Sequence, residues 1–367
     1  MSLKIDDIAH NLKVLKRIEE TPQATSFVLE IPENLKEKFK YKPGQFVSFF
    51  MDVKGEQISR SYSLSSAPEV DEDFQVTVKR VEGGKGSNFL CDHIQAGDTL
   101  KTAPPSGHFF KSMDSTKHFV LFGGGSGITP LFSILKHVLK TKPDARVSLV
   151  YANRSEDQII YKKELQQWAT DHTSRLQIHH LLSQPSAAWE LPTSKITSAW
   201  IGSFLGEIDQ GSTEFYICGP EGYMELCKNA LLESSVAKER VHQESFATSI
   251  PKSAQPATDI DGKTLIGKSP SEEADTYKVS VTLQGVTKEF NVKKDETILE
   301  ALIEAGENPP YSCMDGACMA CMGKVESGLV MQEDPGILTQ ENIDVGECLT
   351  CQSKPRAQNS KITYDIF

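Results

Sequence analysis

The spacing of hydrophobic residues changes twice along the chain and divides it into regions of different predicted structure. Residues 1–112 show little helical periodicity, and turn signals such as Pro43-Gly44 separate their apolar stretches. These short apolar runs lie at residues 27–31, 45–50 and 74–78. Short strands at this spacing are typical of an antiparallel β-barrel. We therefore predict a barrel domain over residues 1–112.

The second region, residues 113–246, alternates strand and helix signals. Nearly continuous apolar runs that predict buried strands lie at residues 118–122, 147–151, 176–182 and 215–218. An amphipathic pattern over residues 128–139 predicts a helix after the first of these strands. Strands that alternate with helices predict a doubly wound α/β domain with a parallel sheet.

The third region begins after residues 247–275, which are rich in Ser, Pro, Lys, Asp and Gly and therefore resemble a linker in composition. The order of expected strands and helices over residues 276–367 predicts a compact unit. Two strands are expected at 277–283 and 286–292, followed by a helix around 297–305 and a cysteine-rich loop.

Composition and charge limit the classes of function. The chain has 367 residues, of which 38% are hydrophobic and 24% charged, and its formal net charge is −11. This acidity argues against nucleic acid as a partner. No stretch approaches the roughly 18 apolar residues of a membrane span, and the N-terminus has no apolar signal segment, so we expect a cytoplasmic protein that does not bind membranes. From residue 276 onward, fourteen acidic and eight basic side chains give −6 of the net charge.

Four cysteines carry the strongest chemical signal. Cys313, Cys318 and Cys321 have the spacing C-x4-C-x2-C, and Cys351 follows thirty residues later. This is the plant-type pattern of [2Fe–2S] ligands. A structural zinc site usually has two close Cys pairs or Cys/His mixtures, and a disulfide framework is unexpected without a signal peptide. Cys348 is an alternative fourth ligand, but the Leu-Thr-Cys ending at Cys351 resembles the closing motif of plant-type ferredoxins.

Two segments of the barrel region have the residues that a flavin nucleotide requires. Arg60, Tyr62 and Ser63 at the end of a strand would supply a cation for the pyrophosphate, a ring over the flavin and a hydrogen-bond donor at its N5. Gly86 and Ser87, just before an apolar helical stretch, would add backbone and hydroxyl groups for a phosphate. Alternatively, these are surface residues of a strand and an ordinary glycine turn.

Glycine-rich turns follow two of the predicted parallel strands. Residues 123–127 read Gly-Gly-Gly-Ser-Gly and precede Thr129 and Pro130 at the start of a helix, which suits a nucleotide pyrophosphate although the G-x-G-x-x-G fingerprint is absent. The Cys-Gly-Pro turn at Cys218 ends another strand, where Cys218 would face a nicotinamide. The alternatives are a plain turn before a core helix and a small buried thiol.

The residues after the predicted strand at 147–151 indicate which nucleotide is bound. Arg154 and Ser155 follow it and would hold a ribose 2′-phosphate, which favours NADPH. Glu156 and Asp157 lie close by, so NADH remains an alternative. At the end of the domain, residues 242–246 offer an acidic group and an aromatic ring that would return to the flavin, or an exposed terminus.

These motifs together resemble the ferredoxin–NADP reductase superfamily: R-x-Y-S-x-S for FAD, and G-G-G-S-G-I-T-P with C-G-P for the pyridine nucleotide. With a C-terminal plant-type ferredoxin, the chain is similar to the single-chain reductase components of bacterial multicomponent oxygenases. Its domain order and the residues of its motifs are most similar to those of the reductase components of phenylacetyl-CoA epoxidases. The resemblance implies a flavin barrel, a nucleotide-binding α/β domain and a β-grasp ferredoxin domain. It also implies the binding residues, which are Arg60, Tyr62, Ser63, Gly86 and Ser87 for FAD and Gly124, Gly125, Thr129 and Cys218 for the nucleotide.

The resemblance further implies an NAD(P)H-dependent oxidoreductase. Electrons would pass from NADPH (or NADH) to FAD, to the [2Fe–2S] cluster and then to a separate oxygenase or hydroxylase, in a phenylacetyl-CoA type of aromatic degradation. Tyr62, Ser63 and Cys218 would surround the reacting rings. The alternatives are an electron-transfer or redox-sensing protein and a reductase that serves a general ferredoxin pool or another hydroxylase.

Overall fold

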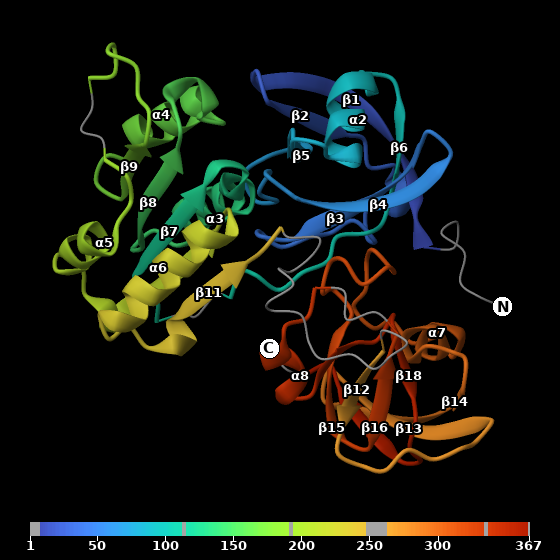
Figure 1. Cartoon of the computed structure of the whole chain (residues 1–367). Coiled ribbons are helices and arrows are strands. Elements are labelled where there is room, and N and C mark those ends of the chain that lie inside the picture. Colours follow the sequence, from blue (N-terminus) through green and yellow to red (C-terminus); the bar gives the residue numbers. More distant parts are fainter. Residues whose placement is uncertain (1–7, 112–114, 191–193, 247–262, 334–336, 366–367) are drawn as a thin grey trace. The chain divides into compact units, whose positions relative to one another are not determined.

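The chain is seen in a computed structural model that describes residues 8–111, 115–190, 194–246, 263–333 and 337–365 (Figure 1). These residues form two compact units. One comprises residues 11–58 and 62–246, and the other contains the C-terminal residues from 263 onward. Among the described residues, no helix has both the length and the apolar character needed to cross a membrane.

The first unit begins with a six-stranded antiparallel barrel. Its strands, in the spatial order β4-β3-β6-β1-β2-β5, are β1 (His10–Thr21), β2 (Ala24–Leu29), β3 (Phe46–Val53), β4 (Glu56–Ser63), β5 (Phe74–Lys79) and β6 (Thr99–Thr102). A bridge between Leu64 and Val76 joins the two ends of the sheet, and Phe27 and Phe49 are fully buried in its interior. Helix α2 (Lys85–His93) follows β5, and the short helix η1 (Glu33–Leu35) follows β2. The predicted barrel is confirmed.

A five-stranded parallel sheet follows the barrel. Its order is β11-β10-β7-β8-β9, and the strands are β7 (His118–Gly124), β8 (Arg146–Asn153), β9 (Leu176–Leu182), β10 (Thr213–Cys218) and β11 (Val241–Glu244). Its helices are α3 (Ile128–Thr141), α4 (Lys162–Asp171), α5 (Ser198–Leu205) and α6 (Glu221–Glu233). Short 3-10 helices are η2 (Gly125–Gly127), η3 (Glu156–Gln158), η4 (Gln210–Ser212) and η5 (Lys238–Arg240).

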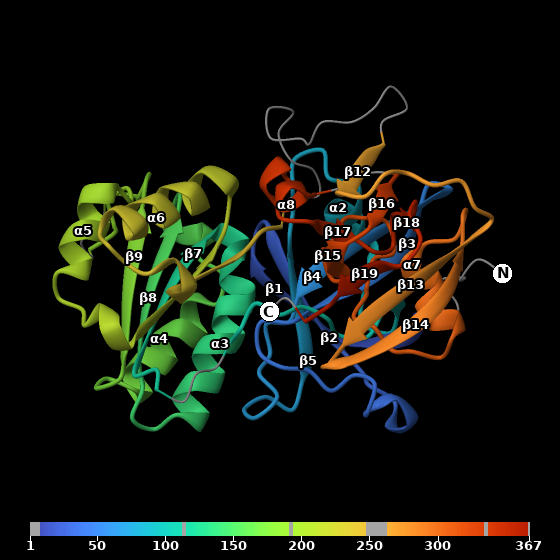
Figure 2. The same ribbon diagram turned by 90° about the horizontal axis from the view of Figure 1, so that it is seen from below.

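Both faces of this sheet are covered, as Figure 2 shows: α3 and α4 lie on one face, and α5 and α6 on the other. Successive residues of a strand point to opposite faces. Accordingly, Leu121 of β7 packs with Leu131 of α3, whereas its neighbour Val120 packs with Leu231 of α6. Because both faces are apolar, the strands read as continuous hydrophobic runs in the sequence. The predicted doubly wound α/β domain is confirmed.

Polar contacts join the barrel to the sheet domain within the first unit. The hydroxyl of Tyr161, just before α4, donates to Thr77 Oγ1 of β5 at 2.5 Å, and Ser133 Oγ of α3 donates to the carbonyl of Ser66 at 2.6 Å. Lys136 of α3 forms an ion pair with Asp71. Helix α3 and the residue before α4 are therefore held against β5 and the segment that precedes it.

The C-terminal unit has two small sheets. The larger has the order β14-β13-β19-β15-β17, with β13 (Thr276–Leu283), β14 (Val286–Lys293), β15 (Met322–Ser327), β17 (Glu347–Leu349) and β19 (Ser360–Thr363). Strands β13 and β19 are parallel and the other pairs antiparallel. Helices α7 (Ile298–Glu304) and α8 (Gln340–Asp344) begin with capping boxes at Thr297 and Thr339, which bond the exposed N–H groups of the first turn. This is the expected α+β arrangement.

The smaller sheet corrects the predicted linker. It comprises β12 (Thr264–Gly267), β16 (Leu329–Gln332) and β18 (Ser353–Pro355). Strand β12 lies inside the range 247–275 that the composition assigned to a linker, and its partner is β16. Thr264 and Ile266 are buried, and Ile266 packs in the same core cluster as Tyr277. The alternation of this four-residue strand was hidden among polar neighbours in the sequence. Residues 247–262 lie outside the described residues.

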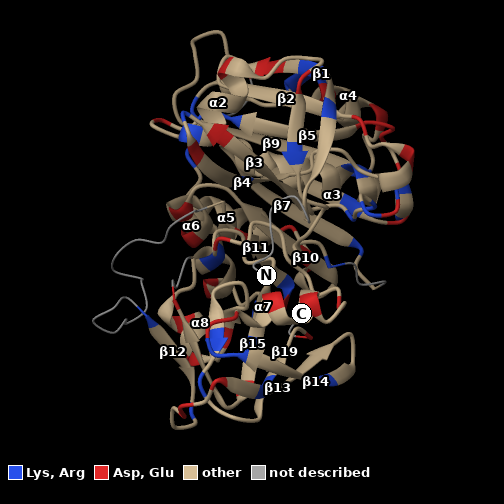
Figure 3. Ribbon diagram, turned by 90° about the vertical axis from the view of Figure 1, so that its right-hand side faces the viewer, with Lys and Arg blue, Asp and Glu red and all other residues tan. Residues whose placement is uncertain are grey.

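Acidic and basic positions are both present on the C-terminal unit (Figure 3). Its ion pairs include Lys278–Glu289 at 2.8 Å, Lys288–Glu307 at 2.7 Å and Lys354–Glu333 at 2.8 Å. Exposed pairs of this kind contribute little to stability. They leave the acidic excess of this unit unchanged, because each pair takes up one charge of either sign.

Candidate functional site

The three clustered cysteines lie in a tight loop between α7 and β15. Met314 and Met319 have positive φ angles of 65° and 53°, and Gly316 has 78°, so the backbone turns sharply around the thiols. Two amide groups point at sulfur: Ala317 N–H donates to Cys313 Sγ, and Cys313 N–H donates to Cys318 Sγ, both at 3.3 Å. Amide donors of this kind stabilise the negative charge of thiolate ligands.

The four predicted cysteines form two contacting pairs. The contact with Cys318 raises the pKa of Cys313, and the contact with Cys321 raises the pKa of Cys351 well above its usual range; burial acts in the same direction in both. Cys313, Cys321 and Cys351 are buried, while Cys318 is half-buried. A loop and a distant strand segment thus bring four thiols to one site.

A two-iron cluster fits this arrangement better than one metal ion. A [2Fe–2S] cluster takes four thiolates, and two pairs give each iron two protein ligands. A structural zinc ion would need four ligands around one centre. The residues present therefore fit the cluster that their spacing predicts.

Cys348 faces away from this group. It lies in β17, where its side chain is fully buried beside Val279 and Ile362 in the core of the larger sheet. Its neighbour Leu349 points to the opposite side and packs in the same cluster as Cys351. Burial raises the pKa of Cys348 to about 12, so it is held as a neutral core thiol.

Polar residues near Cys351, which sequence reasoning missed, tie its segment to the loop. The Thr350 hydroxyl donates to the carbonyl of Cys321 at 2.8 Å and is hydrogen-bonded to the Tyr364 hydroxyl at 2.7 Å. Gln352 Nε2 donates to the carbonyl of Met314 at 3.3 Å. Nothing in the cysteine spacing indicated these contacts, because they depend on the fold of β19 and of the loop.

Strand β4 carries the predicted flavin residues. The Tyr62 ring packs on Phe49 of β3 with ring centroids 5.6 Å apart, and Ser63 is buried. The Arg60 guanidinium donates to the carbonyl of Ser59 at 2.6 Å and is half-buried. Because successive strand residues alternate in direction, Arg60 and Tyr62 share one side of β4. This side therefore offers a cation and an aromatic ring next to each other.

The start of α2 holds the other predicted flavin residues. Its N-cap residue, Gly84, provides no side-chain hydrogen bond, so the first N–H groups of the helix are left for another acceptor. Gly86 and Ser87 are buried there, and Ser87 Oγ accepts from the N–H of Val81 at 3.1 Å. Lys85 Nζ contacts Glu56 Oε2 of β4 at 2.5 Å and ties the helix start to that strand.

The glycine-rich loop after β7 packs directly on the Cys-Gly-Pro turn. A Cβ on Gly127 would lie 2.0 Å from the carbonyl oxygen of Cys218, and one on Gly124 would lie 2.9 Å from Pro220 Cδ. These glycines are therefore required by the approach of two backbones, which explains the absence of the usual fingerprint spacing. The Thr129 hydroxyl donates to the carbonyl of Ser126 at 3.0 Å and stabilises the same loop.

A lysine that sequence reasoning missed lies beside this loop. Lys79, the last residue of β5, has its Nζ atom 3.3 Å from the position of a Cβ on Gly125. Burial, and then the positive charge of Arg154, lower the pKa of Lys79. Among the described residues no carboxylate pairs with Lys79. Lys79 and Arg154 are neighbouring cations, and neither is in an ion pair among the described residues, which indicates an anion-binding site. Only the packing of the barrel on the sheet brings them together.

The end of β8 adds further polar groups. Both polar atoms of the Asn153 side chain are buried; the amide lies beside the Tyr151 hydroxyl but makes no hydrogen bond of good geometry to the described residues. Arg154 is exposed, whereas the Ser155 hydroxyl donates to Asp157 Oδ1 at 2.5 Å. The position that would read the ribose 2′ group thus contains a cation and an anion.

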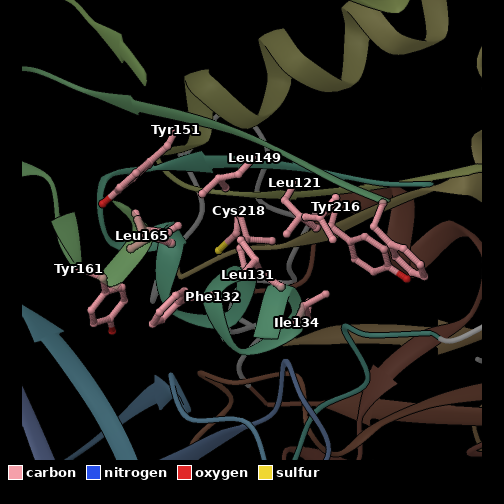
Figure 4. Packing of buried hydrophobic residues seen from close by; sticks show 14 of the residues in the cluster. Leu121, Leu131, Phe132, Ile134, Leu149, Tyr151, Tyr161, Leu165, Tyr216 and Cys218 are labelled. Carbon is pink, nitrogen blue, oxygen red and sulfur yellow. The ribbon is translucent and has the colours of Figure 1, made fainter. Parts of the chain in front are cut away.

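The Cys-Gly-Pro turn meets β11 and β4 at a third polar group, Glu244. Ser63 Oγ donates to Glu244 Oε2 at 3.1 Å, and Glu244 is paired in register with Cys218. Burial raises the pKa of Glu244 to about 8, although the Ser63 hydrogen bond opposes this. Cys218 is fully buried among core residues such as Leu131 (Figure 4), and burial raises its pKa well above the usual range. The thiol is therefore neutral.

A flavin-type barrel, a nucleotide-type sheet and a four-cysteine ferredoxin unit together define an NAD(P)H-dependent flavin and iron–sulfur oxidoreductase. Family models agree over most of the chain: residues 11–110 match an oxidoreductase FAD-binding domain, 121–229 an oxidoreductase NAD-binding domain and 281–356 a 2Fe-2S iron-sulfur cluster binding domain. The cofactors are accordingly FAD, NAD(P)H and [2Fe–2S].

Whole-length relatives give the family. The chain is 36% identical over 356 residues, 96% of each protein, to the ferredoxin reductase component of 3-ketosteroid-9-alpha-monooxygenase from Rhodococcus rhodochrous. It is 28% identical to one of the subunits of 1,2-phenylacetyl-CoA epoxidase from Escherichia coli K12, over 97% of this chain and 98% of that one. Phthalate dioxygenase reductase shares the fold, with a TM-score of 0.56, 22% identity and 98% of both chains covered. The chain belongs to the single-chain reductase components of oxygenase systems.

Proposed function

We propose that this protein takes electrons from NAD(P)H and passes them through FAD and one [2Fe–2S] cluster to a separate oxygenase component. The observation that carries the proposal is that one chain contains matches to all three cofactor-binding domains in the order of the whole-length reductase relatives. We assign residues 1–112 to the flavin domain and 113–246 to the nucleotide domain. The ferredoxin domain, predicted over 276–367, is extended to include strand β12 (Thr264–Gly267).

At the flavin, we assign binding of the pyrophosphate to Arg60, Gly86 and Ser87, because they supply a cation and helix N-terminal donors. Tyr62 covers one ring face. FAD, when bound, accepts two electrons together and releases them one at a time. We assign the Ser63 hydroxyl as a hydrogen-bond donor at the flavin edge. Because a hydroxyl has one proton, this role requires that protonated Glu244, whose pKa is raised to about 8, donate to Ser63 Oγ across the 3.1 Å contact.

At the nucleotide, Gly124, Gly125 and Thr129 form the turn against which the pyrophosphate lies, and Lys79 neutralises its charge. Cys218 packs against the nicotinamide as a neutral thiol. Arg154 and Ser155 bind the ribose 2′ group, with a preference for NADPH. The contact of Ser155 with Asp157 works against this preference, so the discrimination is expected to be modest.

At the cluster, we assign the four ligands to Cys313, Cys318, Cys321 and Cys351. The contacting pairs and the two amide-to-sulfur hydrogen bonds support this set. The core position of Cys348 argues against it as a ligand.

For the acceptor, two kinds of oxygenase have support from relatives. The 36% identity to the Rhodococcus reductase favours a monooxygenase of the ketosteroid type, and the 28% identity to the Escherichia coli protein supports the phenylacetyl-CoA epoxidase type that the motif wording predicts. We place the first ahead of the second because the identity is higher at similar coverage.

Two measurements test the proposal. Reconstituted protein should oxidise NAD(P)H continuously with ferricyanide as the acceptor; absence of turnover would show that it is an electron-transfer or sensing protein. Purified oxygenase components of both types are then mixed with it, and substrate hydroxylation or epoxidation per NAD(P)H is measured. The assignment of the acceptor would be overturned if neither oxygenase forms product with this protein while free ferredoxins are reduced efficiently.

A further inference from the structure

The strand that carries Glu244 has little to hold it in place. Strand β11 has four residues, Val241–Glu244, and lies at the edge of the parallel sheet, where β10 is its hydrogen-bonding neighbour. A slip of one residue in the pairing would turn every side chain to the other face. The 3.1 Å contact of Glu244 with Ser63 therefore requires that the register of β11 be fixed by other interactions.

A buried ionic cluster provides such an interaction. Glu214 of β10 has no solvent exposure, and each of its carboxylate oxygens has one partner. Arg240 Nη1 contacts Oε1 and His242 Nε2 contacts Oε2, both at 2.8 Å. Arg240 also donates to the carbonyl of Thr213 at 3.3 Å. Removing a partner from a buried carboxylate is costly, so this cluster strongly favours one position of β11.

An aromatic stack reinforces the same register. The imidazole of His242 lies on the ring of Tyr216, with centroids 4.7 Å apart and planes 26° apart. The Tyr216 hydroxyl donates to the carbonyl of Lys111 at 2.6 Å, which fixes the tyrosine. His242 is paired with Tyr216, and Glu244 is paired with Cys218 two residues further on. His242 and Glu244 therefore point to the same face of the sheet.

The charges favour a neutral imidazole. Burial lowers the pKa of His242, while the hydrogen bond and charge of Glu214 act in the opposite direction, and Lys111 lowers it further. Arg240 already balances the charge of Glu214, so His242 is not needed as a cation. Nε2 carries the proton that is donated to Glu214. Glu244 itself is faced by Ser63 of β4 and Cys218 of β10.

We infer that His242 is a positioning residue for hydride transfer: by anchoring β11 through Glu214 and Tyr216, it sets the position of Glu244 against Ser63 at the flavin edge. This inference rests on the proposed function, which puts Ser63 and Glu244 at that edge. Misplacement of a group by about 1 Å near the reacting atoms slows catalysis by as much as 100-fold.

The test measures reduction of FAD by NAD(P)H in a single turnover with holoprotein. His242→Phe keeps a ring on Tyr216 but removes the hydrogen bond to Glu214. We expect FAD reduction to slow roughly 10-fold, the nucleotide Kd to change less than about two-fold, and the pH dependence attributable to Glu244 to move to lower pH as Glu244 gains water. His242→Gln, which retains a donor for Glu214, should recover most of the rate.

A double-mutant cycle separates positioning from general destabilisation. If His242 acts through Glu244, H242F/E244Q should be no slower than E244Q alone. His172→Phe is the matched control, because His172 is also half-buried and stacked on an aromatic ring, Trp168, at 4.9 Å. FAD content and Tm are measured for each variant. If H242F does not fold, H242Q takes its place. The FAD reduction rate of H242Q is then compared with that of the parent, and that of H242Q/E244Q with that of E244Q.

The possible failures are distinguishable. If E244Q reduces FAD at the parent rate, the role given to Glu244 in the proposed function is wrong. If E244Q is slow but H242F is not, or if the two losses multiply in the double variant, the positioning inference alone is overturned. An equal loss in H172F would show that the effect is one of general stability.

Discussion

The hydroxyl of Ser63 on barrel strand β4 donates a 3.1 Å hydrogen bond to the Glu244 carboxylate at the end of β11. Residues 181 positions apart in the sequence are thereby joined where the barrel meets the parallel sheet. Burial raises the pKa of Glu244 to about 8, so near neutral pH this carboxyl group is mostly protonated and is itself able to donate. The contact adds to the polar links that Tyr161, Ser133 and Lys136 make between the two domains.

The assignment of the cluster ligands can be tested by replacing Cys351 and Cys348, which lie three positions apart. Cys351→Ser should abolish the visible absorbance of the cluster and reduce the iron content from about two atoms per chain, the number in a [2Fe–2S] centre. FAD content and ferricyanide reduction should remain, because Tyr62, Ser63, Ser87 and the proposed nucleotide residues lie in the other compact unit. Cys348→Ser is the control and should retain the iron. Loss of iron in the Cys348 variant with retention in the Cys351 variant would reverse the assignment.

The anion site can be tested through Lys79. Lys79→Met removes the charge but retains most of the apolar stem, and should raise the KM for NADPH and NADH alike by roughly 10-fold, since a charge-assisted hydrogen bond contributes about 1.5–3 kcal/mol. FAD content should not change. Lys140→Met, in the last turn of α3, is the control. An unchanged KM in the Lys79 variant would mean that the pyrophosphate lies elsewhere.

The choice of nucleotide can be tested at Arg154 and Asp157. Arg154→Ala should raise the KM for NADPH by about 10-fold or more, by the same energy of about 1.5–3 kcal/mol, and leave that for NADH nearly unchanged. Asp157→Ala should lower the KM for NADPH, because it frees the Ser155 hydroxyl. The ratio of kcat/KM for the two nucleotides is measured in each variant. Parallel changes for both nucleotides would show that Arg154 does not contact the 2′-phosphate.

The half-buried carboxyl group of Glu20 predicts how stability depends on pH. Burial raises the pKa of Glu20 on β1 to about 7, although the hydrogen bond from Ser26 opposes this and Glu164 adds to it. Because the folded state binds this proton more tightly, the stabilisation is complete below the unfolded pKa of about 4.5 and is lost as pH rises through about 7. Glu20→Gln should flatten the decline in unfolding free energy over this window by about 1–2 kcal/mol. Chemical denaturation of the apoprotein at several pH values measures it, and an equal slope in both proteins would contradict the prediction.

The acidic balance of the C-terminal unit predicts a salt effect. If this unit steers a basic partner, the rate of reduction of the oxygenase should fall as ionic strength rises, because screening shortens the range of charge attraction. Reduction of FAD by NAD(P)H within the chain should respond far less. Stopped-flow measurements of both steps across a salt series compare them. A similar response of both steps would exclude steering by this unit.

The sequence predicted the barrel and the parallel sheet because their signals are local. The run at residues 118–122 is apolar on both faces, and β7 has two covered faces. Strand β12 was missed because its partner β16 lies some 65 residues later and the core that buries Ile266 is formed by other strands. A four-residue strand has too few positions to show its alternation against polar neighbours.

At the candidate sites, spacing predicted groups that lie close in the chain and failed for groups joined by packing. The C-x4-C-x2-C motif indicated three thiols of one loop, and the structure brings Cys351 to them. Lys79 carried no signal, since a lysine at a strand end is usually solvated. Its meeting with Arg154 depends on how β5 lies against the sheet.

The position of β11 also bears on how such reductases can be recombined. The match to the NAD-binding family model ends at residue 229, but the strand that bears Glu244 follows it. A chimera joined at residue 229 would therefore replace β11 with a foreign sequence, together with Arg240 and His242. A junction beyond residue 244 would carry the whole edge strand with its parent sheet. The unit of exchange is thus longer than the region matched by the NAD-binding family model.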